Sequence, residues 1–275
     1  MSEPATRLTG HAVTGTRRLS GDLTEAVLDD GRVVVVKRGH GTGATAAEAA
    51  GLRWLASAAA VPVPSVHGQD EDWLVIDRVP EGRPTAAAAE RLGHGLARLH
   101  AAGAPAFGAA PPGGPAEAWI GRAPMANATG EDWATWYAEH RVLPYVREAA
   151  DAGTFGPAEV TLFERACGRL PALAEPPSRL HGDLWNGNVL WDGRDAWLID
   201  PAAHGGHRET DLAMLHLFGC PHLDRVVAAY QEVSPLADGW AERIGAHQLF
   251  PLLVHSVLFG QSYAGQAVAA ARSLR

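Results

Sequence analysis

Residues 179–201 read Arg-Leu-His-Gly-Asp-Leu-Trp-Asn-Gly-Asn-Val-Leu-Trp-Asp-Gly-Arg-Asp-Ala-Trp-Leu-Ile-Asp-Pro, and this stretch decides the fold. Val189–Trp191 and Ala196–Leu198 are apolar and β-prone. The four residues between them, 192–195, have the composition of a tight turn. The stretch therefore predicts a loop that leads into a short, rigid β-hairpin.

Three polar side chains flank this hairpin. Asp183 and Asn188 precede it, five residues apart, and Asp200 follows it twelve residues after Asn188. Oxygen ligands beside a rigid hairpin suit Mg²⁺, which is usually bound by one or two carboxylates together with substrate phosphates. The same spacing serves phosphoryl transfer from ATP, where an Asp accepts the proton of the attacking hydroxyl. We predict Asp183 as the base and Asn188 and Asp200 as Mg²⁺ ligands; the alternative is a surface hairpin rich in turn-forming residues.

Composition narrows the class of protein. The chain has 275 residues, 47% of them hydrophobic, which is enough for a sizeable core. Its net charge of −8 argues against a nucleic-acid partner, because phosphate backbones require a basic face. The two cysteines, Cys167 and Cys220, form neither a disulfide framework nor a metal motif, so we expect a reducing cytoplasm. No apolar stretch has the length of a signal peptide core or a membrane span, so we expect no membrane partner.

The N-terminal part has the pattern of a small antiparallel sheet. Residues 12–19 and 23–28 alternate loosely between apolar and polar types, and residues 32–37 form a strongly β-branched run. The turn at residues 20–22 carries Gly21, whose main chain we consider as a cover for ATP phosphates. An ordinary hairpin turn is the alternative for this single glycine.

Four further residues are candidates for nucleotide binding. Lys37 ends the third strand, and Glu48 lies in a helical pattern over residues 42–59. A strand lysine paired with a helix glutamate aims an ammonium at the α and β phosphates, although a lysine at a strand end can also be merely solvated. The main-chain groups of Asp77 and Val79 lie where an adenine edge would need one acceptor and one donor.

The same part of the chain supplies a lobe boundary. Residues 65–69 and 73–77 complete the sheet, and the following segment has the Pro/Gly content of a linker. We expect a small lobe over residues 1–79, a hinge over 80–84 and a larger lobe over 85–275.

The larger lobe should be mostly helical. Residues 107–130 are rich in Gly and Pro and are expected to form a long loop, a length that indicates a functional segment. Strands first and helices afterwards predict an α+β, two-lobed layout of the protein-kinase type. Helices are expected over residues 85–102, 131–152, 157–173, 210–219, 224–233 and 239–271.

The motifs also resemble a known family. His181–Asn188, Asp200–Ala202 and Gly206–Met214 closely resemble the corresponding motifs of the fructosamine kinase (ketosamine kinase) family, and the similarity extends over nearly the whole chain. The resemblance implies a protein-kinase-like fold related to aminoglycoside phosphotransferases. It also implies ATP-dependent phosphorylation of the sugar 3-hydroxyl in ketoamines, that is, fructosamines and ribulosamines, free or protein-bound. The 3-phosphate product is unstable and releases the amine, so the implied role is deglycation.

Several residues are candidates for binding the acceptor substrate. Trp185 could stack on a sugar, with Asn186 hydrogen-bonding its hydroxyls, or it could pack beneath the loop. Asn127 and Trp119 in the long loop and His207 after the hairpin are further substrate candidates.

Residues 204–209 contain two histidines and a glutamate and so invite a metal interpretation. No metal-protease spacing is present, and hydrogen-bonded scaffolding is the more common role of such clusters. We expect Arg208 and Glu209 to brace the loop that contains them. Asp211 is expected either to cap the next helix or to bind the main chain of the loop at residues 181–188, which we call the catalytic loop. His100 is expected to be a hydrogen-bonded interior histidine.

Two other functions stay open. One is a different small-molecule kinase, acting on an aminoglycoside, choline or a similar hydroxylated amine, since an acidic chain suits cationic substrates. The other is a catalytically silent binding protein of kinase fold. The second would be expected to lack Lys37, Asp183, Asn188 or Asp200, and all four are present.

Overall fold

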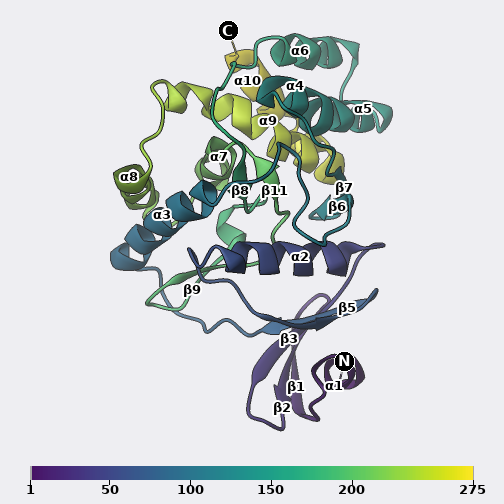
Figure 1. Ribbon diagram of the computed structural model, residues 1–275. Coiled ribbons are helices and arrows are strands. Elements are labelled where there is room, and N and C mark those ends of the chain that lie inside the picture. Colours follow the sequence, from purple (N-terminus) through teal and green to yellow (C-terminus); the bar gives the residue numbers. More distant parts are fainter. Residues whose placement is uncertain (1, 275) are drawn as a thin grey trace.

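The structure, a computed structural model, describes residues 2–274 and consists of two parts (Figure 1). The smaller part is built on an antiparallel five-stranded sheet in the order β1-β2-β3-β5-β4. Two helices, α1 and α2, accompany it. The bounds are α1 (Ser2–Thr9), β1 (Val13–Ser20), β2 (Leu23–Leu28), β3 (Val33–Arg38), α2 (Ala44–Ser57), β4 (Val66–Gln69) and β5 (Trp73–Asp77).

Strand alternation in β3 assigns its side chains to the two faces of this sheet. Val34 and Val36 are fully buried in the cluster that includes residues of α1. Val35 packs instead against the cluster that α2 forms with Leu74 and other residues. Because successive side chains point to opposite faces, Lys37 lies on the α2 side of the sheet.

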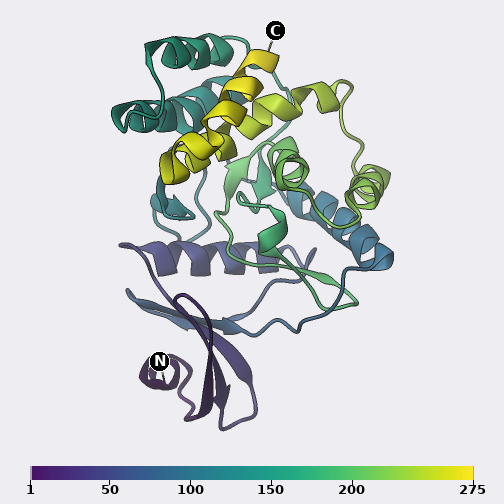
Figure 2. The same ribbon diagram turned by 180° about the vertical axis from the view of Figure 1, so that it is seen from behind.

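The larger part is mostly helical and also contains short two-stranded sheets (Figures 1 and 2). Its core consists of two large apolar clusters, one around α5, α9 and α10 and one around α3 and α8. The bounds are α3 (Ala86–Ala101), β6 (Glu117–Ile120), β7 (Ala123–Ala126), α4 (Trp133–Tyr137), a π-helical turn (Ala138–Val142), α5 (Leu143–Asp151), α6 (Pro157–Cys167), β8 (Ser178–Leu180), a 3₁₀ turn (Asn186–Asn188), β9 (Val189–Trp191), β10 (Ala196–Leu198), β11 (His204–Gly206), α7 (Glu209–Phe218), α8 (Leu223–Val233), α9 (Trp240–Phe259) and α10 (Gln261–Ser273).

Residues 78–85 connect the two parts without regular structure. This linker is fastened to the β9–β10 hairpin, since the Gly82 amide donates to the Trp191 carbonyl at 2.7 Å. A Cβ on Gly82 would lie 2.2 Å from the Asp192 main chain, so only glycine fits there. At the end of the linker, the Thr85 hydroxyl accepts from the Ala88 amide at 3.1 Å and caps α3, at the start of the helix predicted over residues 85–102. The exact lobe boundaries stay a prediction.

Several elements differ from the sequence expectations. The expected loop over residues 107–130 contains the β6–β7 hairpin, and the sequence did not predict β11, which follows Asp200 and pairs with β8. The helix expected over 239–271 is interrupted at Gly260, whose φ of 61° ends α9. Residues 2–9 form a helix that the sequence analysis did not anticipate.

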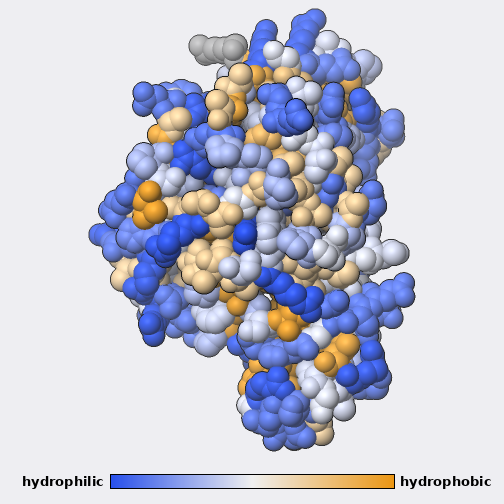
Figure 3. Space-filling model, in the orientation of Figure 1, coloured by the Kyte–Doolittle hydropathy of each residue, from blue (hydrophilic) through white to orange (hydrophobic). Residues whose placement is uncertain are grey.

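The surface seen in Figure 3 is hydrophilic around its rim, with strongly hydrophobic residues in small groups. Among residues 2–274, no helix combines the length and the apolar character that crossing a membrane requires.

Candidate active site

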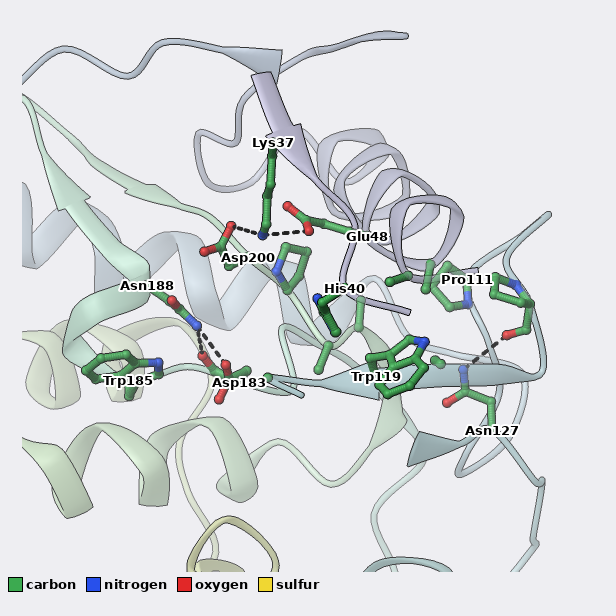
Figure 4. Close-up of a pocket in the computed structure, with 18 residues that line it drawn as sticks. Lys37, His40, Glu48, Pro111, Trp119, Asn127, Asp183, Trp185, Asn188 and Asp200 are labelled. Carbon is green, nitrogen blue, oxygen red and sulfur yellow. Dashed lines mark hydrogen bonds and ion pairs between the residues drawn. The ribbon is translucent and has the colours of Figure 1, made fainter. Parts of the chain in front are cut away.

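A cavity of about 290 Å³ lies where the two parts meet (Figure 4). Its walls come from β3 and α2 on one side and from the catalytic loop, the residues that follow β10 and the β6–β7 hairpin on the other. The lining residues are Lys37, His40, Ala44, Ala47, Glu48, Pro111, Pro115, Ala118, Trp119, Gly121, Asn127, Asp183, Trp185, Asn188, Asp200, Pro201, Ala202 and Ala203.

Lys37 connects the two sides of the cavity. Its ammonium lies 2.7 Å from a Glu48 carboxylate oxygen and 2.9 Å from Asp200 Oδ1 (Figure 4). Burial alone would lower the pKa of Lys37, but Glu48 and Asp200 hold that pKa above its usual value. The predicted pairing of Lys37 with Glu48 is therefore present, and the lysine is cationic at neutral pH.

Asp183 and Asn188 form the second pair. The Asn188 amide nitrogen donates to the Asp183 carboxylate at 2.9 Å and to the Asp183 carbonyl at 2.8 Å. Both N–H bonds of this amide are used, so its carbonyl oxygen is left for another ligand. Burial raises the pKa of the Asp183 carboxyl to about 7, with nearby Asp200 acting in the same direction and the Asn188 hydrogen bond opposing it. A carboxylate with such a pKa is suited to accept a proton near neutral pH.

The main chain before Asp183 is held by a buried carboxylate. Asp211 accepts from the His181 amide at 2.8 Å, from the Gly182 amide at 2.9 Å and from the His100 ring at 3.2 Å. Burial would raise the pKa of Asp211, but the hydrogen bond from His100 and the charges and donors around it hold that pKa below its usual value. Of the two expectations for Asp211, binding of the catalytic-loop main chain is confirmed, and His100 is an interior histidine as predicted.

Gly182 is required by this loop geometry. Its φ is 81°, and a Cβ there would lie 2.1 Å from the Ala202 carbonyl oxygen. Next to it, the His181 ring bridges two segments, accepting from the Asp183 amide at 3.2 Å and donating to the Ile199 carbonyl at 2.9 Å. Burial lowers the pKa of His181, so the ring is neutral and can play both parts. The catalytic loop is thereby tied to the strand that leads to Asp200.

The β9–β10 hairpin brings Asn188 and Asp200 to one end. Val189 pairs with Leu198, and the Ile199 amide donates to the Asn188 carbonyl at 3.1 Å. Asp200 has a φ of 52°, which is unusual for a residue with a side chain and typical of functional sites. A carboxylate and an amide carbonyl are hard oxygen donors, and this donor set fits Mg²⁺.

Three of the predicted substrate residues line the cavity, Trp185 on one side of Asp183 and Trp119 and Asn127 on the other (Figure 4). Trp185 is 39% exposed and lies over Gly187, where a Cβ would meet its ring at 2.2 Å. Asn127 is buried, and its Oδ1 has no hydrogen-bond partner among the described residues. Trp119 lies beside Asn127, and its indole N–H donates to the Thr42 carbonyl at 3.1 Å. These side chains offer a stacking surface and an unused acceptor (Figure 4).

The other predicted site residues lie outside the cavity lining. Asn186 and Gly21 are exposed in turns. The Asp77 amide donates to the Ser65 carbonyl at 3.0 Å, and the Val79 carbonyl accepts from the Arg78 guanidinium. An adenine contact at Asp77 and Val79 therefore depends on the other main-chain group of each and stays a prediction.

His207 is not brought to the substrate, which corrects the sequence expectation. Its side chain is 1% exposed and packs against Trp133 and His247, with ring centroids 5.6 and 5.0 Å away. Burial lowers the pKa of His207 to about 3. Trp133 of α4 and His247 of α9 cover the His207 ring, so this polar residue lies in the core and does not line the cavity.

The cluster of His207, Glu209 and His247 is scaffolding. Its candidate ligand atoms lie within 4.8 Å of one another. However, Arg243 donates to both Glu209 oxygens at 2.9 and 2.5 Å, and the two histidine rings are stacked at 27°. Nitrogen lone pairs in stacked rings do not converge on one ion. Glu209 is thus a brace, and so is Arg208 (to Glu175, 2.6 and 2.7 Å), as expected.

Comparison with known proteins assigns a family to this geometry. A family model described as fructosamine kinase matches residues 12–274. The chain belongs to the fructosamine kinase family. It is 48% identical to a putative fructosamine-3-kinase from Thermobifida fusca, whose crystal structure matches with a TM-score of 0.93 over 100% of this chain and 98% of that one. A probable ketoamine kinase from Klebsiella aerogenes is 36% identical over 220 residues, covering 78% of this chain and 74% of its own length.

The fructosamine kinase fold extends to more distant enzymes. A thermostable mutant of aminoglycoside phosphotransferase APH(4)-Ia, solved in a ternary complex with ADP and hygromycin B, is 16% identical with a TM-score of 0.62, covering 99% of this chain and 98% of that one. These likenesses confirm the predicted α+β, protein-kinase-like fold class, and family membership makes this chain a kinase.

In this fructosamine kinase family member, sequence reasoning missed part of the site. His40 lines the cavity and contacts the edge of Trp119, with ring centroids 5.2 Å apart. The β6–β7 hairpin carries Trp119 and leads to Asn127, so it closes one end of the cavity. The signal available was the unusual length of the Gly/Pro-rich segment, which indicated function but not structure.

Proposed function

We propose that this protein is an ATP-dependent ketoamine 3-kinase, which transfers the γ-phosphoryl group of ATP to the sugar 3-hydroxyl of a fructosamine or ribulosamine. The observation that supports it best is the meeting of Lys37, Asp183, Asn188 and Asp200 around one cavity between the lobes. The similarity to the putative fructosamine-3-kinase from Thermobifida fusca supports the choice of hydroxyl. Loss of the unstable 3-phosphate would then free the amine, which makes deglycation the proposed outcome.

The chain's own residues divide the reaction between them. Asp183 accepts the proton of the sugar hydroxyl as its oxygen forms a bond to the γ phosphorus, and the bond from that phosphorus to the ADP oxygen breaks. Lys37, held by Glu48, directs its ammonium at the α and β phosphates. Asn188 holds the Asp183 carboxylate in one orientation. The complex of ADP with the structurally similar aminoglycoside phosphotransferase supports nucleotide binding in this fold.

A magnesium ion would be held by Asp200 and the free carbonyl of Asn188, and when bound it neutralises charge on the β and γ phosphates. Trp185 and Asn127 line the cavity on opposite sides of Asp183, where Trp185 offers its ring to the substrate and Asn127 offers the buried Oδ1 to a hydroxyl. An unpartnered buried acceptor is costly unless a ligand satisfies it, which favours a polyhydroxylated substrate over an apolar one.

The first test compares candidate acceptor substrates. ATP consumption is measured with a ribulosamine, a fructosamine, an aminoglycoside and choline, and ³¹P and ¹³C NMR locate the phosphate. We expect turnover of a ketoamine, phosphate on the 3-hydroxyl and subsequent release of free amine. Turnover of the aminoglycoside or choline alone would replace the proposal with the alternative small-molecule kinase.

Asp183→Asn tests the role of the base. The rate should fall by about 10²- to 10⁴-fold with little change in ATP affinity. Asp151→Asn, the same chemical change at an exposed site at the end of α5, is the matched control and should leave the rate unchanged. An Asp183→Asn rate above about a tenth of wild type would remove this residue from the role, because a positioned base contributes more than that.

A further inference from the structure

Five aromatic side chains form a continuous row that leads out of the cavity. Trp185, which lines the cavity, contacts Phe218 edge-on with ring centroids 6.0 Å apart. Phe218 lies 4.9 Å from His255 and 6.4 Å from Tyr263. Phe259 completes the row, 5.6 Å from His255 and 5.8 Å from Tyr263. We call these five residues the aromatic row.

The row is assembled where three helices of the larger lobe meet (Figure 2). Phe218 is the last residue of α7 and Phe259 the last of α9, and each precedes a glycine, Gly219 or Gly260, with φ of 78° or 61°. Tyr263 lies in the first turn of α10. Because glycine ends both helices abruptly, their terminal aromatic rings remain at the edge of the lobe instead of entering its core.

Exposure distinguishes the row from an ordinary core cluster. Among residues 2–274, the exposed large hydrophobic residues are three valines and two aromatics, and both aromatics belong to the row: Trp185 at 39% and Phe259 at 57%. Isolated exposed apolar residues are normal, but these two exposed aromatics are connected through the half-buried Phe218, His255 and Tyr263 beside the cavity, and a connected apolar group of this kind marks a binding surface.

The C-terminal end of α9 also lies close to the cavity. A Cβ built on Gly121, which lines the cavity at the β6–β7 turn, would lie 3.5 Å from Leu258 Cδ1, directly before Phe259. The end of α9 is therefore next to the β6–β7 hairpin, which closes one end of the cavity. A substrate that leaves the cavity past Trp185 meets the aromatic row at once.

The row contains one directed polar group. His255 Nδ1 lies 2.6 Å from the Pro251 carbonyl, which can only accept, so Nδ1 carries the proton. Burial lowers the pKa of His255, and the ring is neutral at physiological pH. Its Nε2 is then an acceptor, suited to an N–H group of a ligand.

The chemistry of a ketoamine matches this surface. With a sugar hydroxyl at Asp183, the amine nitrogen and a substituent that extends past Trp185, which lines the cavity and is 39% exposed, would contact the aromatic row. That nitrogen is a secondary ammonium, and cations are attracted to aromatic faces. We propose, on the basis of the ketoamine kinase function above, that the aromatic row binds the amine-borne portion of the substrate and selects ketoamines whose nitrogen carries an aromatic or long apolar group.

The test holds the sugar constant and varies the amine. The ketoamine of phenethylamine is compared with that of ethanolamine, each with the sugar that wild type turns over. We expect kcat/KM to be about tenfold higher for the phenethylamine derivative, chiefly through a lower KM, which is the range of an aromatic contact with partial burial. Equal kcat/KM values would overturn the proposal.

Variants assign the preference to the row. Phe259→Ser, on an exposed side chain, should reduce the ratio of the two kcat/KM values from about ten to about two, through the KM of the phenethylamine derivative. Val233→Ser removes a comparably exposed apolar side chain (47%) on α8 and should leave the ratio and the rates unchanged. A ratio unaffected by Phe259→Ser would overturn the role of the row. Phosphorylation of neither ketoamine would refute the proposed function itself, and the role of the row with it.

Discussion

Replacing Asp211 with Asn tests how the catalytic loop is held. The carboxylate of Asp211 is buried and accepts from two consecutive main-chain amides, those of His181 and Gly182, as well as from His100. Asparagine has nearly the same shape but only one acceptor oxygen. One main-chain N–H would therefore face an NH₂ group in a site closed to water.

The magnitude follows from these contacts. A buried donor without a partner costs about 1–3 kcal/mol, and the remaining bonds lose the contribution of the charge. We take about 3 kcal/mol as the total, which the protein can lose as stability or relieve by moving the loop. Since 1.36 kcal/mol is a factor of ten in rate, relief by movement of Asp183 lowers kcat by up to about 100-fold.

The assay combines kinetics with unfolding. Asp211→Asn should reduce kcat by about 10- to 100-fold with the KM for ATP changed less than about threefold, in a protein that still unfolds cooperatively in urea. Tyr230→Phe is the matched control, because it removes only the hydroxyl 2.9 Å from His100 Nδ1 and leaves the loop contacts in place. Its expected cost is about 1 kcal/mol of stability with kcat within about twofold. An Asp211→Asn enzyme with more than half of the wild-type kcat would refute the reasoning.

Two further predictions concern packing and pH. Gly41→Ala would place a Cβ 2.4 Å from the Trp119 ring, so kcat/KM should fall about tenfold, and the Gly41→Ala/Trp119→Ala double variant should be no worse than Trp119→Ala alone; additive losses would argue against this contact. Burial lowers the pKa of His204 and of His207 from 6.5 to about 3, so below pH 6.5 the unfolded chain binds more protons than the folded one. The free energy of unfolding therefore decreases as the pH is lowered. Together they should lower the free energy of unfolding by about 2 kcal/mol between pH 6.5 and 5.5, and urea unfolding curves that coincide at these two pH values would contradict this.

The β9–β10 hairpin could be predicted because the sequence features that specify it are local. Val189–Trp191 and Ala196–Leu198 have strand composition on either side of a turn, and the structure forms β9 and β10 with these bounds. The pairing of Lys37 with Glu48 could also be predicted, since a strand end and a following helix restrict where two charged side chains point. The catalytic and nucleotide-binding roles of these residues stay predictions.

The β6–β7 hairpin could not be predicted because its stability comes from distant partners. β7 contains Pro124, whose carbonyl accepts from the Tyr145 hydroxyl at 2.7 Å, and β6 presents Trp119 to Thr42 in the other lobe. Such short strands with weak β propensity form only when their tertiary neighbours are in place. β11 is a similar case, a His-Gly-Gly segment paired with β8.

The aromatic row and the buried position of His207 could not be predicted from the sequence either. Which face of a segment becomes interior depends on helix packing that sequence periodicity does not describe. The helical pattern over residues 239–271 gave no sign that Gly260 would adopt a positive φ and leave Phe259 at the edge.

The bond between the Gly82 amide and the Trp191 carbonyl has a mechanical consequence for the catalytic cycle. The connection between the lobes is anchored on the very hairpin whose far end carries Asn188 and Asp200. Any wide tilting of the sheet lobe must therefore break this anchor or pull the hairpin with it. In the proposed reaction, admission of a new nucleotide and the binding of Mg²⁺ would in this way be linked through the main chain, because the Leu198 amide of the same hairpin also donates to the Pro62 carbonyl of the smaller lobe at 3.0 Å.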